Sequence, residues 1–326
     1  MRQDKFKKLI DGLDELTPRQ RQKVVETLSE KTPLDDTLQV VNSRKVNHQR
    51  CPNCQFEELN KWGKKGGVQR YRCKGCGKTC NALTGSPLAR LGHRETWAEF
   101  ALTMKDGLST KEAGEICGVE PKTAFRWRHR WLRLPCDDKG KKFSGPVEVG
   151  ETFFLESQKG SKAWQKAKSA ECGGEPSRPP RQRGGQASRR GLSSEQIPVL
   201  VVRDRHGTVT DAVLPALDKK SIKAVLSPIM TKGTLLCTDG LRIYRTLAKE
   251  EGFAHQVLNS SAGPQAEGRV FHTQNINAYH SRLRDWLGRF RGVSTHYLPN
   301  YLGWRRMLEQ NGDDLTPATI LGLSMG

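Results

Sequence analysis

Apolar residues recur with two different spacings along this chain. Near the N-terminus they fall three or four residues apart, at Phe6, Leu9, Ile10, Leu13 and Leu16. A second stripe of the same kind begins at Thr17-Pro18, so residues 1–47 are predicted to form a small helical hairpin. This hairpin would serve equally well as a dimer contact or as a plain structural pair. Residues 94–133 also show helical spacing, and cysteines crowd residues 48–82 between the two helical regions.

The second half of the chain alternates short apolar runs with helical patterns. Strands are predicted at residues 146–155, 197–203, 208–214, 234–238 and 254–258. Helices are predicted at residues 221–230, 241–252 and 273–290. The turn Asp204-Arg205-His206-Gly207 joins the second and third runs into a β-hairpin. This order of elements predicts a mixed sheet flanked by helices.

Residues 158–190 break the pattern, with nine basic residues, two acidic residues and three prolines. This composition predicts a basic loop, either lying on a DNA backbone or solvated as an insertion.

Charge narrows the class of partner. The 326 residues include 55 Lys and Arg against 35 Asp and Glu, a formal charge of +20. Such an excess favours nucleic acid, although a solvated basic surface, as in ribosomal or lipid-surface proteins, has the same composition. No apolar run reaches the roughly 18 residues of a membrane helix, and the N-terminus, Met1 to Lys5, lacks the apolar stretch expected of a signal peptide. We therefore expect a soluble intracellular protein of two or three domains, with no membrane partner.

Nine cysteines are present, and four of them form two C-x-x-C pairs. Cys51 and Cys54 make the first pair, and Cys73 and Cys76 the second, with 18 residues between the pairs. Two such turns complete a tetrahedral four-thiolate site for one structural Zn²⁺ with no open position. Cys80 is expected to pack as a spare thiol. The basic residues near the pairs suit a phosphate backbone: Lys64, Lys65, Arg70, Arg72, Lys74 and Lys78.

Residues 108–128 fit a helix-turn-helix. Ser109 and Glu112 form a capping-box pair, Gly118 falls in the turn, and Pro121 opens the second helix. Ala113 is small where the helices would cross. Val119, Ala124 and either Trp127 or Phe125 are expected to face inward. The residues expected to face the DNA major groove are Lys122, Thr123, Arg126, Arg128 and Arg130. An ordinary helical hairpin is the alternative.

Two segments resemble a known family. Residues 73–91 (CKGCGKTCNALTGSPLARL) resemble the zinc-ribbon segment of bacterial insertion-sequence transposases of the ISXO-like group, and residues 274–304 are similar to that group's catalytic helix and the stretch after it. The resemblance spans about residues 45–310. It implies an RNase-H-like core using two Mg²⁺ or Mn²⁺ ions, with an acidic triad whose third member can be Asn. The expected architecture is multidomain α+β: an N-terminal helical segment (1–47), a zinc ribbon (48–90), a helix-turn-helix (91–140) and an RNase-H-like mixed-sheet core (141–326).

Carried over by position, the second acidic residue is Asp239 and the third is Asn277, with Arg284 at the position of a family Lys or Arg. The first acidic position falls on Gly150. Strand alternation points Glu151 to the opposite face, while Glu148 starts roughly 6.6 Å away, two residues at about 3.3 Å each. A bulge or register shift could bring either glutamate in. Without one, a single carboxylate, Asp239, would serve two dications.

The sequence therefore predicts a transposase that binds terminal inverted repeats and target DNA but cuts poorly. A dimer or larger assembly on DNA is expected, in the bacterial cytoplasm near the nucleoid. Gly150 favours one alternative, a non-enzymatic DNA-binding regulator on the same scaffold. An RNA-binding zinc-ribbon protein is a further alternative, which the helix-turn-helix disfavours.

Overall fold

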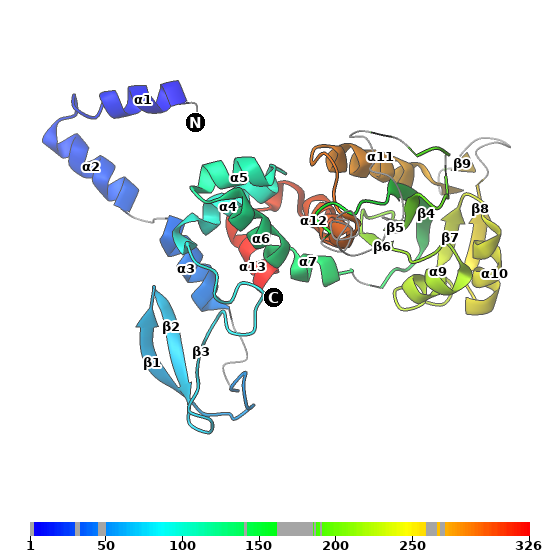
Figure 1. The fold of residues 1–326 in the computed structure, drawn as a ribbon, viewed down its shortest axis with the longest axis horizontal. Helices are drawn as coiled ribbons and strands as arrows, with labels where there is room; N and C mark the ends of the chain where they lie inside the picture. Colours follow the sequence, from blue (N-terminus) through cyan, green and yellow to red (C-terminus); the bar gives the residue numbers. More distant parts are fainter. Residues whose placement is uncertain are drawn as a thin grey trace, which may run out of the picture. The chain divides into compact units, whose positions relative to one another are not determined.

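The computed structural model of the chain describes residues 3–29, 33–44, 50–139, 142–161, 185, 187–189, 191–258, 266–267 and 271–326. The chain forms two compact units (Figure 1). The first contains positions 1–102 together with Thr316–Met325, and the second contains Thr103–Leu315. Helix α4 (Trp97–Lys105) runs from the first unit into the second. The last helix of the chain is thus part of the same unit as its beginning.

The first unit begins with three helices rather than the predicted pair, α1 (Gln3–Asp11), α2 (Pro18–Ser29) and α3 (Pro33–Ser43). Helix α2 starts where Thr17-Pro18 predicted it. The Thr17 backbone N–H donates to the Gln20 side chain at 2.9 Å, and the Gln20 N–H donates back to Thr17 Oγ1 at 3.4 Å. This capping box satisfies two donors that a helix start leaves unpaired.

An antiparallel sheet of three strands follows, in the order β1 (Leu59–Lys65), β2 (Val68–Cys73) and β3 (Thr79–Asn81). Lys65 pairs with Val68, so only Gly66 and Gly67 form the turn. Their φ angles of 55° and 74° are those of a two-residue hairpin turn, which glycine adopts without strain. A short 3₁₀ turn, η1 (Arg94–Thr96), leads to α4, and α13 (Pro317–Met325) packs on α3.

The second unit opens with three helices, α5 (Thr110–Cys117), α6 (Pro121–Trp131) and α7 (Arg133–Asp137). A five-stranded sheet follows, in the order β6-β5-β4-β7-β8 (Figure 1). Its strands are β4 (Pro146–Leu155), β5 (Gln196–Asp204), β6 (Val209–Val213), β7 (Leu235–Thr238) and β8 (Ala254–Val257). Strands β4, β5 and β6 pair antiparallel, whereas β7 runs parallel to both β4 and β8. The sheet is therefore mixed, as predicted.

Helices cover both faces of this sheet (Figure 1). The core on one face joins Val147 and Val149 of β4 to α9 (Lys219–Leu226) and α10 (Arg242–Glu251). The long helix α11 (Gln274–Gly288) packs against β4 and β5, and α12 (Leu298–Asn311) packs against β6. Alternation along β4 thus sends odd positions toward α9 and α10 and even positions toward α11. The remaining short elements are β9 (Ala266–Glu267), β10 (Phe271–His272), η3 (Thr295–Tyr297) and η4 (Gly312–Asp314).

A buried ionic cluster fastens α11 and α12 to the sheet. Asp211 on β6 is 2 % exposed and pairs with Arg306 of α12. Tyr279 of α11 donates a hydrogen bond from its hydroxyl to Asp211 Oδ2 at 3.2 Å. Arg306 also donates to the carbonyls of Pro135 and Cys136. Because the charges are paired and their remaining hydrogens are bound, this cluster holds helices and sheet in one arrangement.

Most of the predicted basic loop at residues 158–190 lies outside the described residues. Within the part of the chain that the structure describes, no helix has the length and apolar character needed to cross a bilayer.

Candidate functional site

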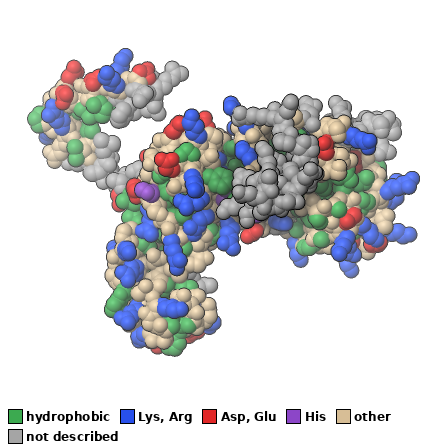
Figure 2. All heavy atoms as spheres, viewed as in Figure 1, with side chains coloured by type: hydrophobic (Ala, Val, Ile, Leu, Met, Phe, Trp, Pro, Cys, Tyr) green, Lys and Arg blue, Asp and Glu red, His purple; other side chains and the backbone are tan. Residues whose placement is uncertain are grey.

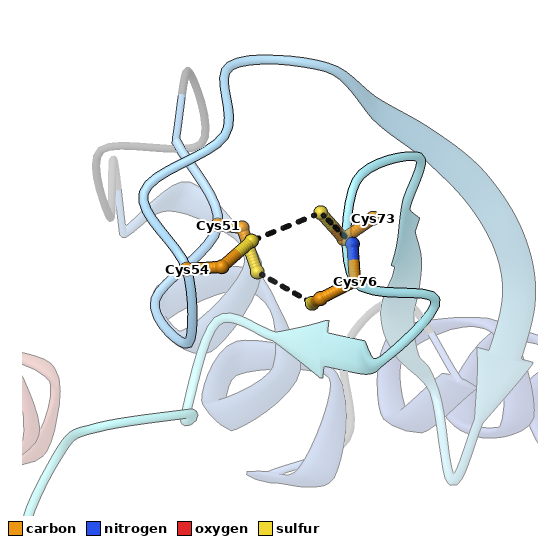
Figure 3. A group of neighbouring side chains, drawn as sticks. All are labelled: Cys51, Cys54, Cys73 and Cys76. Carbon is orange, nitrogen blue, oxygen red and sulfur yellow. Dashed lines mark hydrogen bonds between the residues drawn. The ribbon is translucent and has the colours of Figure 1, made fainter.

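The four paired cysteines converge at one end of the three-stranded sheet (Figure 3). Their sulfur atoms all lie within 4.8 Å of one another. Cys51 Sγ is 3.7 Å from Cys76 Sγ, and Cys54 Sγ is 3.6 Å from Cys73 Sγ. A tetrahedral zinc site with Zn–S bonds of about 2.3 Å has sulfur atoms about 3.8 Å apart. The spacing therefore suits one tetrahedral ion, with all four ligands supplied by the protein.

Cys80 lies on β3 and is not part of this group of ligands. It is 5 % exposed, and burial together with the neighbouring cysteines raises the pKa of its thiol. A buried thiol with a raised pKa is a packing residue, in keeping with the prediction for Cys80.

The strands beside the cysteines carry basic side chains toward solvent (Figure 2). Six of the seven residues of β1 are exposed, among them Lys61, Lys64 and Lys65. Trp62 is 47 % exposed, and the Arg72 guanidinium lies 4.7 Å from its ring centroid. A strand with so little buried side-chain area contributes little to a core, so its residues are available to a partner.

Helices α5 and α6 form the predicted helix-turn-helix. The Glu112 backbone N–H donates to Ser109 Oγ at 3.2 Å, and the Ser109 N–H donates to Glu112 Oε2 at 2.8 Å. Gly118 ends α5 with φ 62°, a left-handed value that favours glycine. Pro121 is at the first turn of α6. The close approach is at Gly114, where an added Cβ would lie 2.7 Å from the Val119 carbonyl oxygen.

The faces of α6 agree with the prediction except at one residue. Ala124 and Trp127 are buried, and Phe125 is 36 % exposed, so Trp127 is the inward aromatic residue. Lys122 and Arg126 are exposed, and Thr123 and Arg130 are half-buried.

Arg128 was expected to face DNA, but its side chain is fully buried. Its guanidinium lies 4.8 Å from the Trp304 ring centroid, and its Nη2 donates to the Leu108 carbonyl at 2.6 Å. Burial lowers the pKa of this guanidinium. Charged groups are buried only when they gain partners, so Arg128 anchors α6 to α12. The prediction that Arg128 faces DNA was therefore wrong.

Gly150 lies within β4, and Asp239 lies just beyond β7, the strand that runs parallel to β4. The parallel register runs from Pro146 with Leu235 to Glu148 with Cys237, two residues before Gly150 on β4 and two residues before Asp239. Asp239 follows the last residue of β7 and is exposed. Residues just beyond parallel strands meet at one edge of a sheet, which is where α/β proteins bind ligands.

Glu148 shares the α11 face with Gly150, but its carboxylate is already bound. The side chain is fully buried and pairs with Arg205. Its Oε2 accepts a hydrogen bond from the backbone N–H of Ile276 at 2.8 Å. The carboxylate thus joins the sheet to the first turn of α11, and freeing it would break its ion pair with Arg205 and its hydrogen bond to this N–H.

Glu151 faces the other side of the sheet. Its Oε1 accepts a hydrogen bond from the Tyr244 hydroxyl of α10. Burial, with a contribution from the charge of Asp239, raises the pKa of Glu151 to about 7. The opposite orientations predicted for positions 150 and 151 are therefore those of the structure.

The space over Gly150 is bordered by α11. A Cβ added to this buried glycine would lie 3.5 Å from His280 Cε1 and 3.5 Å from Ile276 Cδ1, which are ordinary contact distances. Burial and the charge of Arg284 lower the pKa of His280 to about 4, so the ring is neutral. Its Nε2 is buried and has no hydrogen-bond partner among the described residues. Sequence reasoning missed His280, although it lies one turn after Asn277.

The outer face of α11 carries the residues expected there. Asn277, Ser281 and Arg284 are all exposed, while Ile276, Leu283 and Leu287 are buried. Asn277 follows Ile276 and precedes His280 by three residues, and these two neighbours border Gly150, whereas the side chain of Asn277 is exposed.

Comparison with known proteins gives two family matches. The model of the ISXO2-like transposase domain matches residues 142–305, half of the chain, and a homeodomain-like domain matches residues 94–135. A protein of Halobacterium salinarum, described as an uncharacterized protein in transposable element ISH50, is 29 % identical over 257 residues, covering 77 % of this chain and 82 % of the relative.

Among solved structures, that of a pre-cleavage Mos1 transpososome is similar over 69 % of this chain and 80 % of the other. Its TM-score of 0.18 at 12 % identity does not establish a shared fold.

Proposed function

Because the chain belongs to the ISXO2-like transposase family, we propose that it binds the DNA ends of an insertion sequence and that Gly150 impairs its own strand cleavage. Binding would involve the basic ribbon and the exposed basic residues Lys122 and Arg126 of α6. Since a transposase must bring two DNA ends together, we also propose a dimer or larger assembly on DNA. Such a protein would act on chromosomal DNA in the cytoplasm.

The proposed core is RNase-H-like. Support comes from the strand order β6-β5-β4-β7-β8, with a central β4 parallel to β7 and α11 packed across the sheet. Gly150, Asp239 and Asn277 would then be the three positions of the catalytic site, with Arg284 two turns beyond Asn277 on the exposed face of α11. In an intact site, two Mg²⁺ or Mn²⁺ ions would activate the attacking oxygen and stabilise the leaving one.

The ligands of this chain suit two dications poorly. Asp239 brings one negative charge, Asn277 offers a neutral carbonyl, and Gly150 offers nothing. Hard divalent cations prefer carboxylate oxygen. The two nearest glutamates do not replace the missing acid, because Glu148 is bound to Arg205 and Glu151 faces α10.

One observation carries the proposal that a carboxylate is missing at position 150. His280 Nε2 is a buried polar atom without a partner among the described residues, on a ring whose Cε1 is 3.5 Å from the place of a Cβ on Gly150. Buried polar groups are nearly always hydrogen-bonded, so an unpaired one calls for an explanation. An Asp at position 150 would supply an acceptor next to this nitrogen.

The ribbon is proposed to hold one structural Zn²⁺ through Cys51, Cys54, Cys73 and Cys76. Sulfur separations of 3.6 and 3.7 Å support this proposal. With four protein ligands, the ion would order the ribbon and take no part in strand cleavage.

A non-enzymatic DNA-binding regulator is the second candidate, and Gly150 is the observation that favours it. The deciding experiment uses DNA that borders the gene of this protein. The chain is expected to retard this DNA in a gel but to nick it no faster with Mg²⁺ or Mn²⁺ than its Asp239→Ala variant does. Metal-dependent nicking that disappears in Asp239→Ala would contradict impairment, and failure to retard the DNA would contradict both candidates.

A further inference from the structure

A cavity of about 790 Å³ lies in the second unit, between the helix-turn-helix and the loop that joins α11 to α12. Its walls include the first turn of α5, Phe125 and His129 of α6, and residues 289–294. None of the residues assigned to the proposed catalytic site belongs to it. Pockets of about 300–1,000 Å³ enclose a single small ligand, so this one is too small for a duplex.

Three aromatic rings line one wall. His129 and Tyr297 are stacked, with centroids 3.8 Å apart and an interplanar angle of 24°. Phe125 meets both rings edge-on, at 4.4 Å and 5.2 Å, and is 36 % exposed. Burial lowers the pKa of His129 to about 4, so this wall is uncharged near neutral pH. Flat, uncharged rings are the surface on which nucleobases stack.

The rest of the lining is basic. Four exposed cationic side chains border the cavity, Lys111, Lys159, Arg289 and Arg291, against the two carboxylates Glu112 and Glu115, so positive charge is in excess. Both carboxylates already have partners, since Glu112 Oε2 accepts a hydrogen bond from the Ser109 backbone N–H and Glu115 lies 3.8 Å from Lys111. Arg291 is exposed at the rim, where it suits a phosphate better than a neutral ligand.

We propose that this cavity receives an unstacked nucleotide of a DNA strand, with the base against Phe125 and the phosphate on Arg291. The proposal rests on the proposed function, since it concerns DNA held by α6. Phe125 is the direct chain neighbour of Arg126, an exposed residue that we propose contacts the duplex. A strand that separates from a duplex on α6 would therefore meet the cavity first.

The test measures the affinity of the full chain for a labelled oligo-dT strand and for a fully paired duplex. Phe125→Ala is expected to weaken oligo-dT binding by at least about fivefold, the lower end for loss of one stacked base. Arg291→Gln is expected to lower the salt dependence of oligo-dT binding by about 0.7 in the log–log slope, as one lost phosphate contact predicts. Duplex affinity should be unchanged in both variants.

Two variants separate recognition from folding. Phe125→Leu keeps apolar volume but removes the ring and should behave as Phe125→Ala does. Ile116→Ala removes an apolar side chain that is 53 % exposed and outside the cavity, and should leave oligo-dT binding intact. Unaltered oligo-dT binding by Phe125→Ala overturns the inference even if duplex binding persists. Phe125-dependent oligo-dT binding without any duplex binding would instead support the cavity and contradict the proposed function.

Discussion

Replacing Gly150 with Asp should restore Mg²⁺-dependent cleavage of the element's ends. The added Cβ meets its nearest neighbours, His280 Cε1 and Ile276 Cδ1, at 3.5 Å, so this atom is accommodated at ordinary contact distance. The φ angle of Gly150 is outside the left-handed range, so the backbone tolerates a side chain. Loss of a partner that merely orients a metal ligand typically costs about 10–100-fold in activity. Regaining a direct ligand should therefore raise the cleavage rate by at least about 100-fold.

In the absence of metal, Gly150→Asp should lower the stability of the fold. A buried carboxylate beside Glu148 and Asp239 is poorly solvated, and burying such a group typically costs about 1–3 kcal/mol. For a unit of this size, each kcal/mol lowers Tm by about 2–4 °C. Saturation with Mg²⁺ at about 100 times its Kd contributes about 2.7 kcal/mol and should reverse the loss. The parent chain, with one carboxylate, should show little change in Tm with Mg²⁺.

Controls distinguish the charge from the volume of the new side chain. Gly150→Asn adds the same number of heavy atoms without a negative charge, and should neither cut nor gain Mg²⁺-dependent stability. In Gly150→Asp, the new carboxylate should also raise the pKa of His280 above its present value of about 4, which NMR titration of the ring would detect. Equal cleavage by the parent and Gly150→Asp, or an unchanged His280 titration, would refute the reasoning.

Further predictions concern the ribbon, α6 and the sheet. Purified chain should release about one Zn²⁺ on chelation; Cys54→Ser should abolish zinc binding, and Cys80→Ser should retain it. Lys122→Ala should weaken DNA binding without lowering Tm, whereas Arg128→Ala should lower Tm by breaking buried contacts; a normal Tm in the latter would contradict its anchoring role. The pKa of about 7 for Glu151 exceeds the usual 4.5 because burial disfavours the ionised carboxylate. Above pH 7 the ionised group should therefore lower the free energy of unfolding by about 3 kcal/mol, and below about pH 4.5 it should have no effect. Stability should thus fall as pH rises through this window, and Glu151→Gln should flatten the decline in pH-dependent thermal melts.

The sequence correctly predicted the features that depend only on residues close together in the chain. The capping pair Ser109 and Glu112, the turn at Gly118 and the start at Pro121 follow from the chemistry of helix ends, and the structure has all of them. The strand predicted at 146–155 coincides with β4. The two cysteine pairs converge because each C-x-x-C turn positions its thiols locally.

The features that depend on packing between distant parts of the chain were not predicted from the sequence. The partners of Arg128 include Trp304, far along the chain, so helical periodicity alone made this residue look exposed. No helix was predicted after residue 290, yet α12 and α13 follow. In α12 the buried residues include Leu298, Tyr301, Leu302, Trp304 and Met307, which leaves little of the one-sided pattern that marks a surface helix.

The surroundings of Gly150 also bear on how the proposed defect would be reversed in the gene. Glycine and aspartate codons can differ by a single middle base. With such a codon, one transition would introduce the carboxylate, and the first carbon of its side chain would meet His280 and Ile276 at 3.5 Å, an ordinary contact distance. A copy that carries the proposed defect would then be one mutational step from an acidic residue at this position.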